Sequence, residues 1–274
     1  MATLTTYPDG TPRHVVRVAV FIPVECQLLD AATIDIIGSM GYEWRRKLYV
    51  EATNPPPPSP DMDTFRHLLP TVLIDLAPRV EIHYVGPVPA GSPIRVTANE
   101  SILATDHYDD AAVAPGNLDI VLVPGPDPLA RYPAGALDWL RRQAQTPGVD
   151  VLSVCTGIFV CGEAGLVKGK TVCGPRPMQD MIRQRGFGER ELVGDRYRWV
   201  QDGNFWSAGG VTNGNDLVAA YCRATPRHFP RSTAEIAITT MDLGDRGREY
   251  PVDIPLQDKI NYWVREAEAL VAKK

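Results

Sequence analysis

The sequence is poor in clustered positive charge. Its 274 residues carry a formal net charge of −5, and the sequence pI is about 5.6. Basic residues gather only in short groups such as Arg45-Arg46-Lys47 and Arg141-Arg142. Because binding to a phosphate backbone requires concentrated positive charge, we expect no nucleic-acid partner.

Long apolar runs are also missing. No run approaches the roughly 18 residues that a helix needs to cross a bilayer. The N-terminus has no basic region followed by an apolar core of signal-peptide length. We therefore expect a cytoplasmic protein without a membrane partner.

The cysteines do not form a metal or disulfide pattern. The five are Cys26, Cys155, Cys161, Cys173 and Cys222, an odd number without paired zinc spacing. Reduced thiols fit this pattern better than a disulfide framework. We expect neither a metal nor another cofactor.

What the sequence does contain is an alternation of apolar strands and helical segments. Strands are predicted over 14–23, 79–87, 118–126, 149–155 and 171–175, and helices over 28–48, 136–145, 156–167, 178–186 and 215–224. Hairpins are predicted over 93–103 and 197–208. This alternation favours an α/β fold with a mainly parallel sheet covered by helices on both faces.

We expect a single domain over residues 1–274. The segment 51–78 contains four consecutive prolines, and both it and 225–254 are interpreted as insertions on the α/β core. A C-terminal amphipathic helix is predicted over 255–274.

One strand end carries a candidate nucleophile. The apolar run VDVLSVC (149–155) ends at Cys155, and a turn of small residues leads into a helical segment. Ligands of open α/β sheets bind beyond the carboxyl ends of the strands, where amides and a helix N-terminus favour negative charge and lower a thiol pKa. The pattern alone supports two interpretations equally: a reactive nucleophile or a small buried residue.

Four segments, in order, resemble the DJ-1/PfpI superfamily and together cover most of 15–222. They are VRVAVFIPVECQLLDAATIDIIGSM, LDIVLVPGP, CTGIFVCGEAGLVKGKTV and FWSAGGVTNGNDLVAA. The second matches a strand that usually ends in Pro-Gly-Gly, and the third matches the turn that follows the nucleophile. The Cys-Thr-Gly sequence is most similar to the isonitrile-hydratase-like subgroup.

This resemblance implies a flavodoxin-like sandwich of the class I glutamine amidotransferase type, and usually a homodimer. It implies Cys155 as nucleophile and Asp30 as its acidic partner. A carboxyl group beside a thiol can share its proton and act as a general acid and base. Without the resemblance, Asp30 is better explained as a helix N-cap. Thr156 is expected to offer its amide, and also its hydroxyl, to a developing negative charge, or simply to begin a capped helix.

The chain departs from the family at two places. Gly125-Pro126 replaces a glycine pair, and because proline has no N–H, an anion-stabilising amide is lost unless Gly125 or Asp127 supplies it. We expect these three residues and Gly157 to line the substrate site. Cys173-Gly174-Pro175-Arg176 stands where many relatives have a histidine. Among the other histidines (14, 67, 83, 107 and 228), His67 and His107 are the ones to test as replacement bases.

Further residues have two interpretations each. Cys26 and Cys173 are expected near the same strand ends, as redox groups or, preferably, as small apolar filling. Trp199, Phe205 and Trp206 line an apolar pocket or belong to the core. Asn213, Asn215 and Asp216 are interpreted mainly as caps of the late helix.

Three functional hypotheses follow. The first is an enzyme in which Cys155 attacks a small electrophilic substrate and Asp30 moves protons, as in hydration of an isonitrile to an N-substituted formamide. The second is a glyoxalase-like or deglycase-like enzyme acting on reactive carbonyls, which generally uses Glu and His beside the cysteine. The third is a non-catalytic small-molecule sensor or stress-response module.

Overall fold

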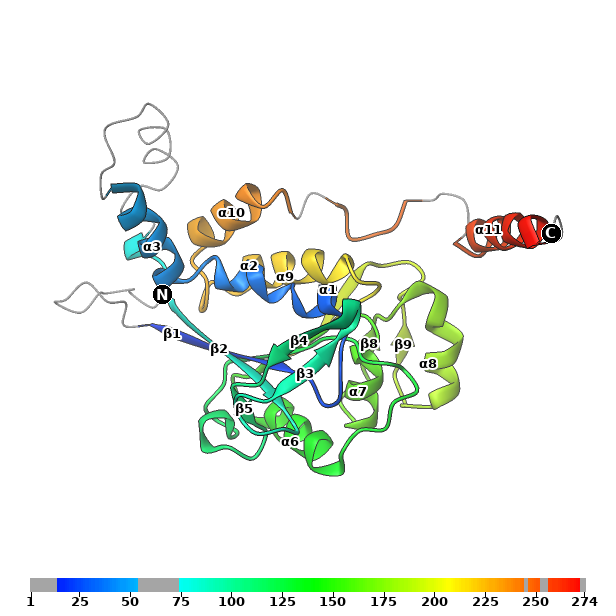
Figure 1. Cartoon of the computed structure of the whole chain (residues 1–274), viewed down its shortest axis with the longest axis horizontal. Coiled ribbons are helices and arrows are strands. Elements are labelled where there is room, and N and C mark those ends of the chain that lie inside the picture. The colour runs from blue at the N-terminus through cyan, green and yellow to red at the C-terminus, as the bar shows by residue number, and fades with distance from the viewer. Residues whose placement is uncertain (1–13, 54–73, 244–245, 252–255, 272–274) are drawn as a thin grey trace.

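A computed structural model describes residues 14–53, 74–243, 246–251 and 256–271 (Figure 1). Its strands are β1 (Val15–Phe21), β2 (Arg79–Gly86), β3 (Pro93–Val96), β4 (Glu100–Leu103), β5 (Asp106–His107), β6 (Ile120–Val123), β7 (Asp150–Ser153), β8 (Thr171–Val172), β9 (Glu191–Leu192), β10 (Trp199–Asp202) and β11 (Phe205–Ala208). Its α-helices are α1 (Leu28–Ala31), α2 (Ile34–Gly38), α3 (Tyr42–Thr53), α6 (Ala134–Gln145), α7 (Gly157–Glu163), α8 (Gln179–Arg185), α9 (Asn213–Ala224), α10 (Arg231–Thr240) and α11 (Leu256–Val271). Short 3-10 turns are η1 (Thr97–Asn99), η2 (Ala111–Val113) and η3 (Arg176–Met178).

The central sheet, as far as the described residues show it, has seven strands in the order β10-β11-β7-β6-β1-β2-β5. All neighbouring strands are parallel except the β10–β11 hairpin. The order β2-β1-β6-β7-β11 is the flavodoxin-like order, which confirms the predicted fold class. β8 and β9 pair separately, so the predicted strand 171–175 is real but lies outside the central sheet.

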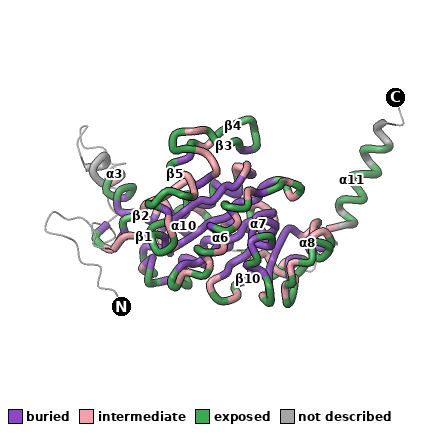
Figure 2. The backbone as a smooth tube through the Cα atoms, turned by 90° about the horizontal axis from the view of Figure 1, so that it is seen from below, coloured by how far each residue is buried: buried purple, intermediate pink, exposed green. Residues whose placement is uncertain are grey.

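Helices cover both faces of the sheet, as predicted (Figure 1). α2, α9 and α10 lie on one face, and α6 and α7 on the other. β1 contributes to the hydrophobic core on each face of the sheet, because successive side chains along a strand point to opposite faces. Val16, Val18 and Val20 pack on the α2–α9 side, whereas Ala19 and Phe21 pack on the α6–α7 side. Figure 2 shows the buried residues gathered in the middle of the molecule and the exposed ones toward its edges.

The prediction of one continuous helix over 28–48 is wrong. The segment forms α1, α2 and α3, separated by short turns. The Thr33 hydroxyl donates to the Asp30 carbonyl at 2.9 Å, and Gly38 and Gly41 bracket the second break. A Cβ on Gly41 would lie 3.3 Å from the Val80 side chain, so the chain turns where it meets β2 closely. The break leaves Asp30 on a short helix of its own.

The predicted insertions are only partly visible. Residues 54–73, most of the first one, and His67 within them lie outside the described residues. In the second, α10 packs Ala234, Ala237 and Ile238 into the core beside α9. The C-terminal helix is confirmed as α11, which stands away from the sheet and exposes Tyr262 and Trp263 (Figure 2).

Candidate active site

Three adjacent parallel strands bring the candidate residues to one edge of the sheet. β6 lies between β1 and β7. The turn after β1 leads to Asp30, the turn after β6 contains Gly125, and the turn after β7 contains Cys155. The strand order reverses at β1 and β6, and such a switch point is where ligands of open α/β sheets bind.

Cys155 lies in a sharp turn between β7 and α7. Its φ angle is 56°, in the left-handed region that costs a residue with a side chain roughly 1–2 kcal/mol. An extended strand or a right-handed helix would point the Cys155 side chain in a different direction, so the strained turn fixes where the thiol lies. The residue is buried, with 8% of its surface exposed.

Asp30 is a buried acid in direct contact with this thiol. The N-cap of α1 is Gln27, so the interpretation of Asp30 as a helix cap is wrong. Its Oδ2 accepts a hydrogen bond from the Gly125 N–H at 3.0 Å. Its Oδ1 is also buried and has no hydrogen-bond partner, and the Cys155 thiol is close enough to lower the pKa of the carboxyl group. Burial raises the pKa of Asp30 to about 7, although the Gly125 and Cys155 hydrogen bonds oppose the shift.

The thiol pKa differs from the sequence prediction. Burial, followed by the charge of Asp30, raises the pKa of Cys155 to about 12. The backbone N–H groups of Thr156 and Val211 lower the pKa of the thiol, but they do not outweigh burial. The prediction that the turn lowers the pKa of the thiol was therefore wrong. At neutral pH the sulfur of Cys155 is protonated, and it lies beside the Asp30 carboxyl group, which can accept the proton.

The loop after β6 has already used its amides. The Gly125 N–H donates to Asp30, and the Asp127 N–H donates to Glu25 Oε1 at 2.8 Å. Neither amide replaces the one lost at Pro126. A Cβ on Gly125 would lie 2.4 Å from Thr156 Oγ1 and 2.6 Å from Asp30 Oδ2. Glycine is required here because the three turns meet at this point.

Thr156 and Gly157 support the turn. The Thr156 hydroxyl donates to the Pro126 carbonyl at 2.6 Å, so it is not free for a substrate. Its amide remains directed at the sulfur of Cys155. A Cβ on Gly157 would lie 2.3 Å from the Val123 carbonyl oxygen, so this glycine allows α7 to approach β6.

Val211 is a site residue that the sequence analysis missed. It lies just before α9, within the segment FWSAGGVTNGNDLVAA that carried the resemblance. Its side chain gives no chemical signal, because only its backbone N–H reaches the sulfur. The match of that segment to the family was the only available indication.

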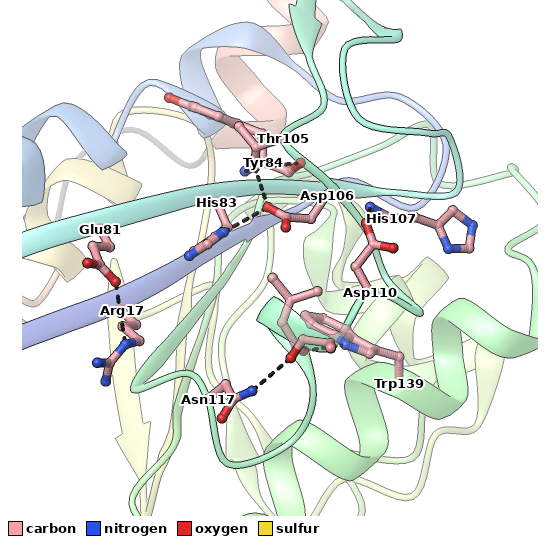
Figure 3. Close-up of polar contacts among 12 residues, drawn as sticks. Arg17, Glu81, His83, Tyr84, Thr105, Asp106, His107, Asp110, Asn117 and Trp139 are labelled. Carbon is pink, nitrogen blue, oxygen red and sulfur yellow. Dashed lines mark hydrogen bonds and ion pairs between the residues drawn. The ribbon is translucent and has the colours of Figure 1, made fainter.

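None of the four described histidines is placed to replace the missing base. His83 Nδ1 lies 2.7 Å from Asp106 Oδ2, and Figure 3 shows the two side chains facing one another. His107 is on β5, where it packs against Tyr108, and β5 lies four strands from β7, which is about 19 Å at the usual strand spacing. His14 and His228 stack on each other, near Asp150 at the opposite, amino end of β7. Among the described residues, Asp30 is the titratable side chain that shifts the pKa of Cys155.

Cys26 and Cys173 occupy different surroundings. Cys26 is buried, and the charge of Asp30 helps raise its pKa, so it lies near the site as predicted. Cys173 packs instead with Val193 and Val200, and its thiol donates to the Tyr197 carbonyl at 3.1 Å. Small apolar filling is the role that this packing fits for Cys173.

The aromatic and capping interpretations are also resolved. Phe205 and Trp206 are core residues, each 2% exposed, and Trp199 stacks on Trp206. Thr212, not a later residue, is the N-cap of α9, and the helix has no side-chain cap. Asn213 donates to the Tyr250 hydroxyl at 2.6 Å.

Asp216 forms an ion pair with Arg246. Within the described residues, no cluster of three or more His, Cys, Asp or Glu side chains has a metal-site arrangement. No described helix combines the length and apolar character needed to span a membrane.

Comparisons with known proteins agree with this architecture. A curated relative, "Isonitrile hydratase" of Pseudomonas putida, is 32% identical over 128 residues. The match covers 46% of this chain and 51% of that protein, so it spans about half the length of the relative.

Solved structures share the fold at low identity. A ThiJ/PfpI family protein from Pseudomonas syringae gives a TM-score of 0.62 at 20% identity, covering 99% of this chain and 93% of that one. Drosophila melanogaster DJ-1beta gives 0.57 at 12% identity, covering 84% and 98%. An AraC family transcriptional regulator from Pseudomonas putida gives 0.55 at 14%, covering 82% and 99%.

The model of the DJ-1/PfpI family matches residues 70–224, more than half of the chain. This range contains the turns of Gly125 and Cys155 and the Val211 amide. The strand order and the cysteine turn are thus those of a recognised family, and the chain belongs to the DJ-1/PfpI family.

Proposed function

We propose that the protein is a cysteine-dependent enzyme that hydrates a small isonitrile to an N-substituted formamide. The observation that carries the proposal is the Cys155–Asp30 pair, in which a buried acid with a pKa near 7 contacts a protonated thiol. A curated isonitrile hydratase that is 32% identical over about half its length supports the choice of reaction.

The first step forms a bond between the sulfur and the terminal isonitrile carbon. Because the pKa of Cys155 is near 12, the sulfur attacks as its proton passes to the Asp30 carboxylate. Asp30 then delivers this proton to the same carbon, giving an enzyme-bound thioimidate, R–N=CH–S. The Thr156 and Val211 amides stabilise negative charge on the sulfur during the transfer.

The second step consumes one water. Asp30, again a carboxylate, removes a proton from water as the oxygen adds to the thioimidate carbon, and it then delivers this proton to the nitrogen. The resulting tetrahedral adduct, R–NH–CH(OH)–S, breaks its C–S bond and loses the hydroxyl proton to restore the thiol. The products are R–NH–CHO and the free Cys155 thiol, so atoms and protons balance.

The alternatives have less support at this site. Glyoxalase-like and deglycase-like chemistry in the family generally uses Glu and His, whereas the titratable partner of Cys155 within the described part of the chain is Asp30. A non-catalytic sensor would not need a proton acceptor whose pKa is near neutral pH. A transcriptional regulator does share the fold, at 14% identity. The buried acid therefore favours catalysis.

The test is turnover of a panel of isonitriles and 2-oxoaldehydes by the purified protein, with formamide detected by its formyl proton. Wild type should hydrate at least one isonitrile, while Cys155→Ala should abolish turnover. Cys173→Ala is the matched control, because it removes a buried thiol that does not contact Asp30. Consumption of 2-oxoaldehydes without hydration of any isonitrile would overturn the proposal.

We also propose that this single-domain chain works as a homodimer on a small-molecule substrate. The exposed apolar side chains of Leu29, Leu129 and Trp263 provide surface for association. Light scattering should give a mass near twice the chain's 30.1 kDa, and a monomer at working concentration would contradict this.

A further inference from the structure

Beside the candidate site lies a group of residues that its proposed chemistry does not use. Tyr250, in the segment 246–251, has its hydroxyl bonded to Asn213 Nδ2 at 2.6 Å. Two guanidinium groups lie over its ring: Arg176 at 4.1 Å from the centroid and Arg198 at 4.5 Å. Two positive charges thus converge on one half-buried aromatic ring.

The charge of Arg198 opposes the burial-driven rise in the pKa of Asp216, a carboxyl group that is already paired with Arg246. No ion pair to either arginine occurs among the described residues. Arg198 uses its Nε to donate to the Gly247 carbonyl at 3.0 Å. Arg176 has no such hydrogen bond in the described structure, so the N–H groups of its guanidinium lack a protein acceptor. The ring of Tyr250 instead holds this guanidinium in place.

The group is connected to Cys155 by two short routes. The Tyr250 hydroxyl lies 3.0 Å from the position of a Cβ on Gly209, and two residues later the Val211 N–H contacts the Cys155 sulfur. Because consecutive Cα atoms are about 3.8 Å apart, the Gly209 and Val211 Cα atoms are within about 7.6 Å of each other.

The second route leads from Arg176 through Gly174 to α7. A Cβ on Gly174, two residues before Arg176, would lie 3.4 Å from the Ile158 side chain. Ile158 is in the first turn of α7, directly after the Cys155 turn. Both routes bring the segments that carry Arg176 and Tyr250 against the segments that hold the Cys155 turn.

We propose that Arg176, held by Tyr250, binds a carboxylate on the substrate of the Cys155 site. An unpaired guanidinium presents parallel N–H donors that match a carboxylate, and Arg198 adds positive charge behind it. The preferred substrates are then isonitriles that carry a carboxylate several bonds from the reacting carbon. This inference rests on the proposed function for the reaction, but the preference for an anion can be measured by binding alone.

The binding experiment compares two product analogues, 4-formamidobutanoate and its neutral methyl ester, by isothermal titration calorimetry. Wild type should bind the carboxylate at least tenfold more tightly than the ester. Arg176→Gln should remove this preference. Arg183→Gln, which makes the same charge change at an exposed arginine paired with Asp180, should retain it. Tyr250→Phe should retain most of the preference, because the ring that holds Arg176 is kept.

Turnover separates this inference from the proposed reaction. The carboxylated isonitrile should have a lower KM than its ester, with a similar kcat, and Arg176→Gln should raise the KM for the carboxylate only. Hydration of both compounds with equal KM, together with equal binding of both analogues, would overturn the inference and leave hydration intact. A tenfold binding preference without turnover of either isonitrile would overturn hydration and leave the carboxylate site intact.

Discussion

Replacing Asp30 by Asn should stabilise the fold at neutral pH while it removes activity. Burial raises the pKa of Asp30 from 3.8 to about 7. Between these pH values the native protein retains a proton that the unfolded chain has released, so stability falls as pH rises through this window. At 1.36 kcal/mol per pKa unit, the ionised carboxylate costs the native state up to about 4 kcal/mol above pH 7.

The neutral amide of Asn avoids this cost and can still accept the Gly125 hydrogen bond. Any packing penalty of the amide is independent of pH, so the change with pH isolates the charge. Relative to wild type, Asp30→Asn should gain about 2–4 kcal/mol in the free energy of unfolding between pH 4 and pH 8. Denaturant titrations at a series of pH values measure this difference. Asp35→Asn, on the exposed side of α2, is the control and should change stability by no more than about 0.5 kcal/mol.

The same variant tests the chemistry. Turnover should fall by about 10²–10⁴-fold, the usual loss when a general acid and base is removed. Because the charge of Asp30 raises the pKa of Cys155, that pKa should fall in the variant, as followed by ultraviolet absorbance of the thiolate. A stability difference that stays constant from pH 4 to pH 8 would refute the argument that Asp30 is a buried ionisable acid.

Three further predictions follow from the same contacts. Gly125→Ala should cost about 1–3 kcal/mol in unfolding free energy and abolish turnover, because its Cβ would collide with Thr156 and Asp30; retained activity would contradict this. Thr156→Val should cost about 1–3 kcal/mol by leaving the Pro126 carbonyl without its donor, whereas Thr156→Ser should stay near wild type in the same denaturant assay. Burial, and then Arg227, lowers the pKa of His228 from 6.5 to about 4, so wild type should lose up to about 3 kcal/mol as pH falls through this window. His228→Gln should flatten that loss, and an unchanged acid profile would contradict the shift.

Much of the architecture followed from local patterns in the sequence. The buried strand 118–126 and the run 149–155 were predicted because continuous apolar segments of that length suit a parallel sheet covered on both faces. The β10–β11 hairpin was predicted from its turn, where Gly203 has a φ of 65°. The single helix over 28–48 failed, because its breaks depend on contact with β2 and on a hydroxyl bond that periodicity does not record.

The candidate site also has features that the sequence determines and features that depend on the fold. The sequence by itself determined that a cysteine ends β7, that an acid follows β1 and that a Gly-Pro pair follows β6, because these are properties of neighbouring residues. Only the tertiary structure decided that Gly125 donates to Asp30, that the Val211 amide reaches the sulfur and that burial raises the thiol pKa. The physical reason is that desolvation and hydrogen bonding at Cys155 depend on segments from β1 to α9, which meet only when the sheet has formed.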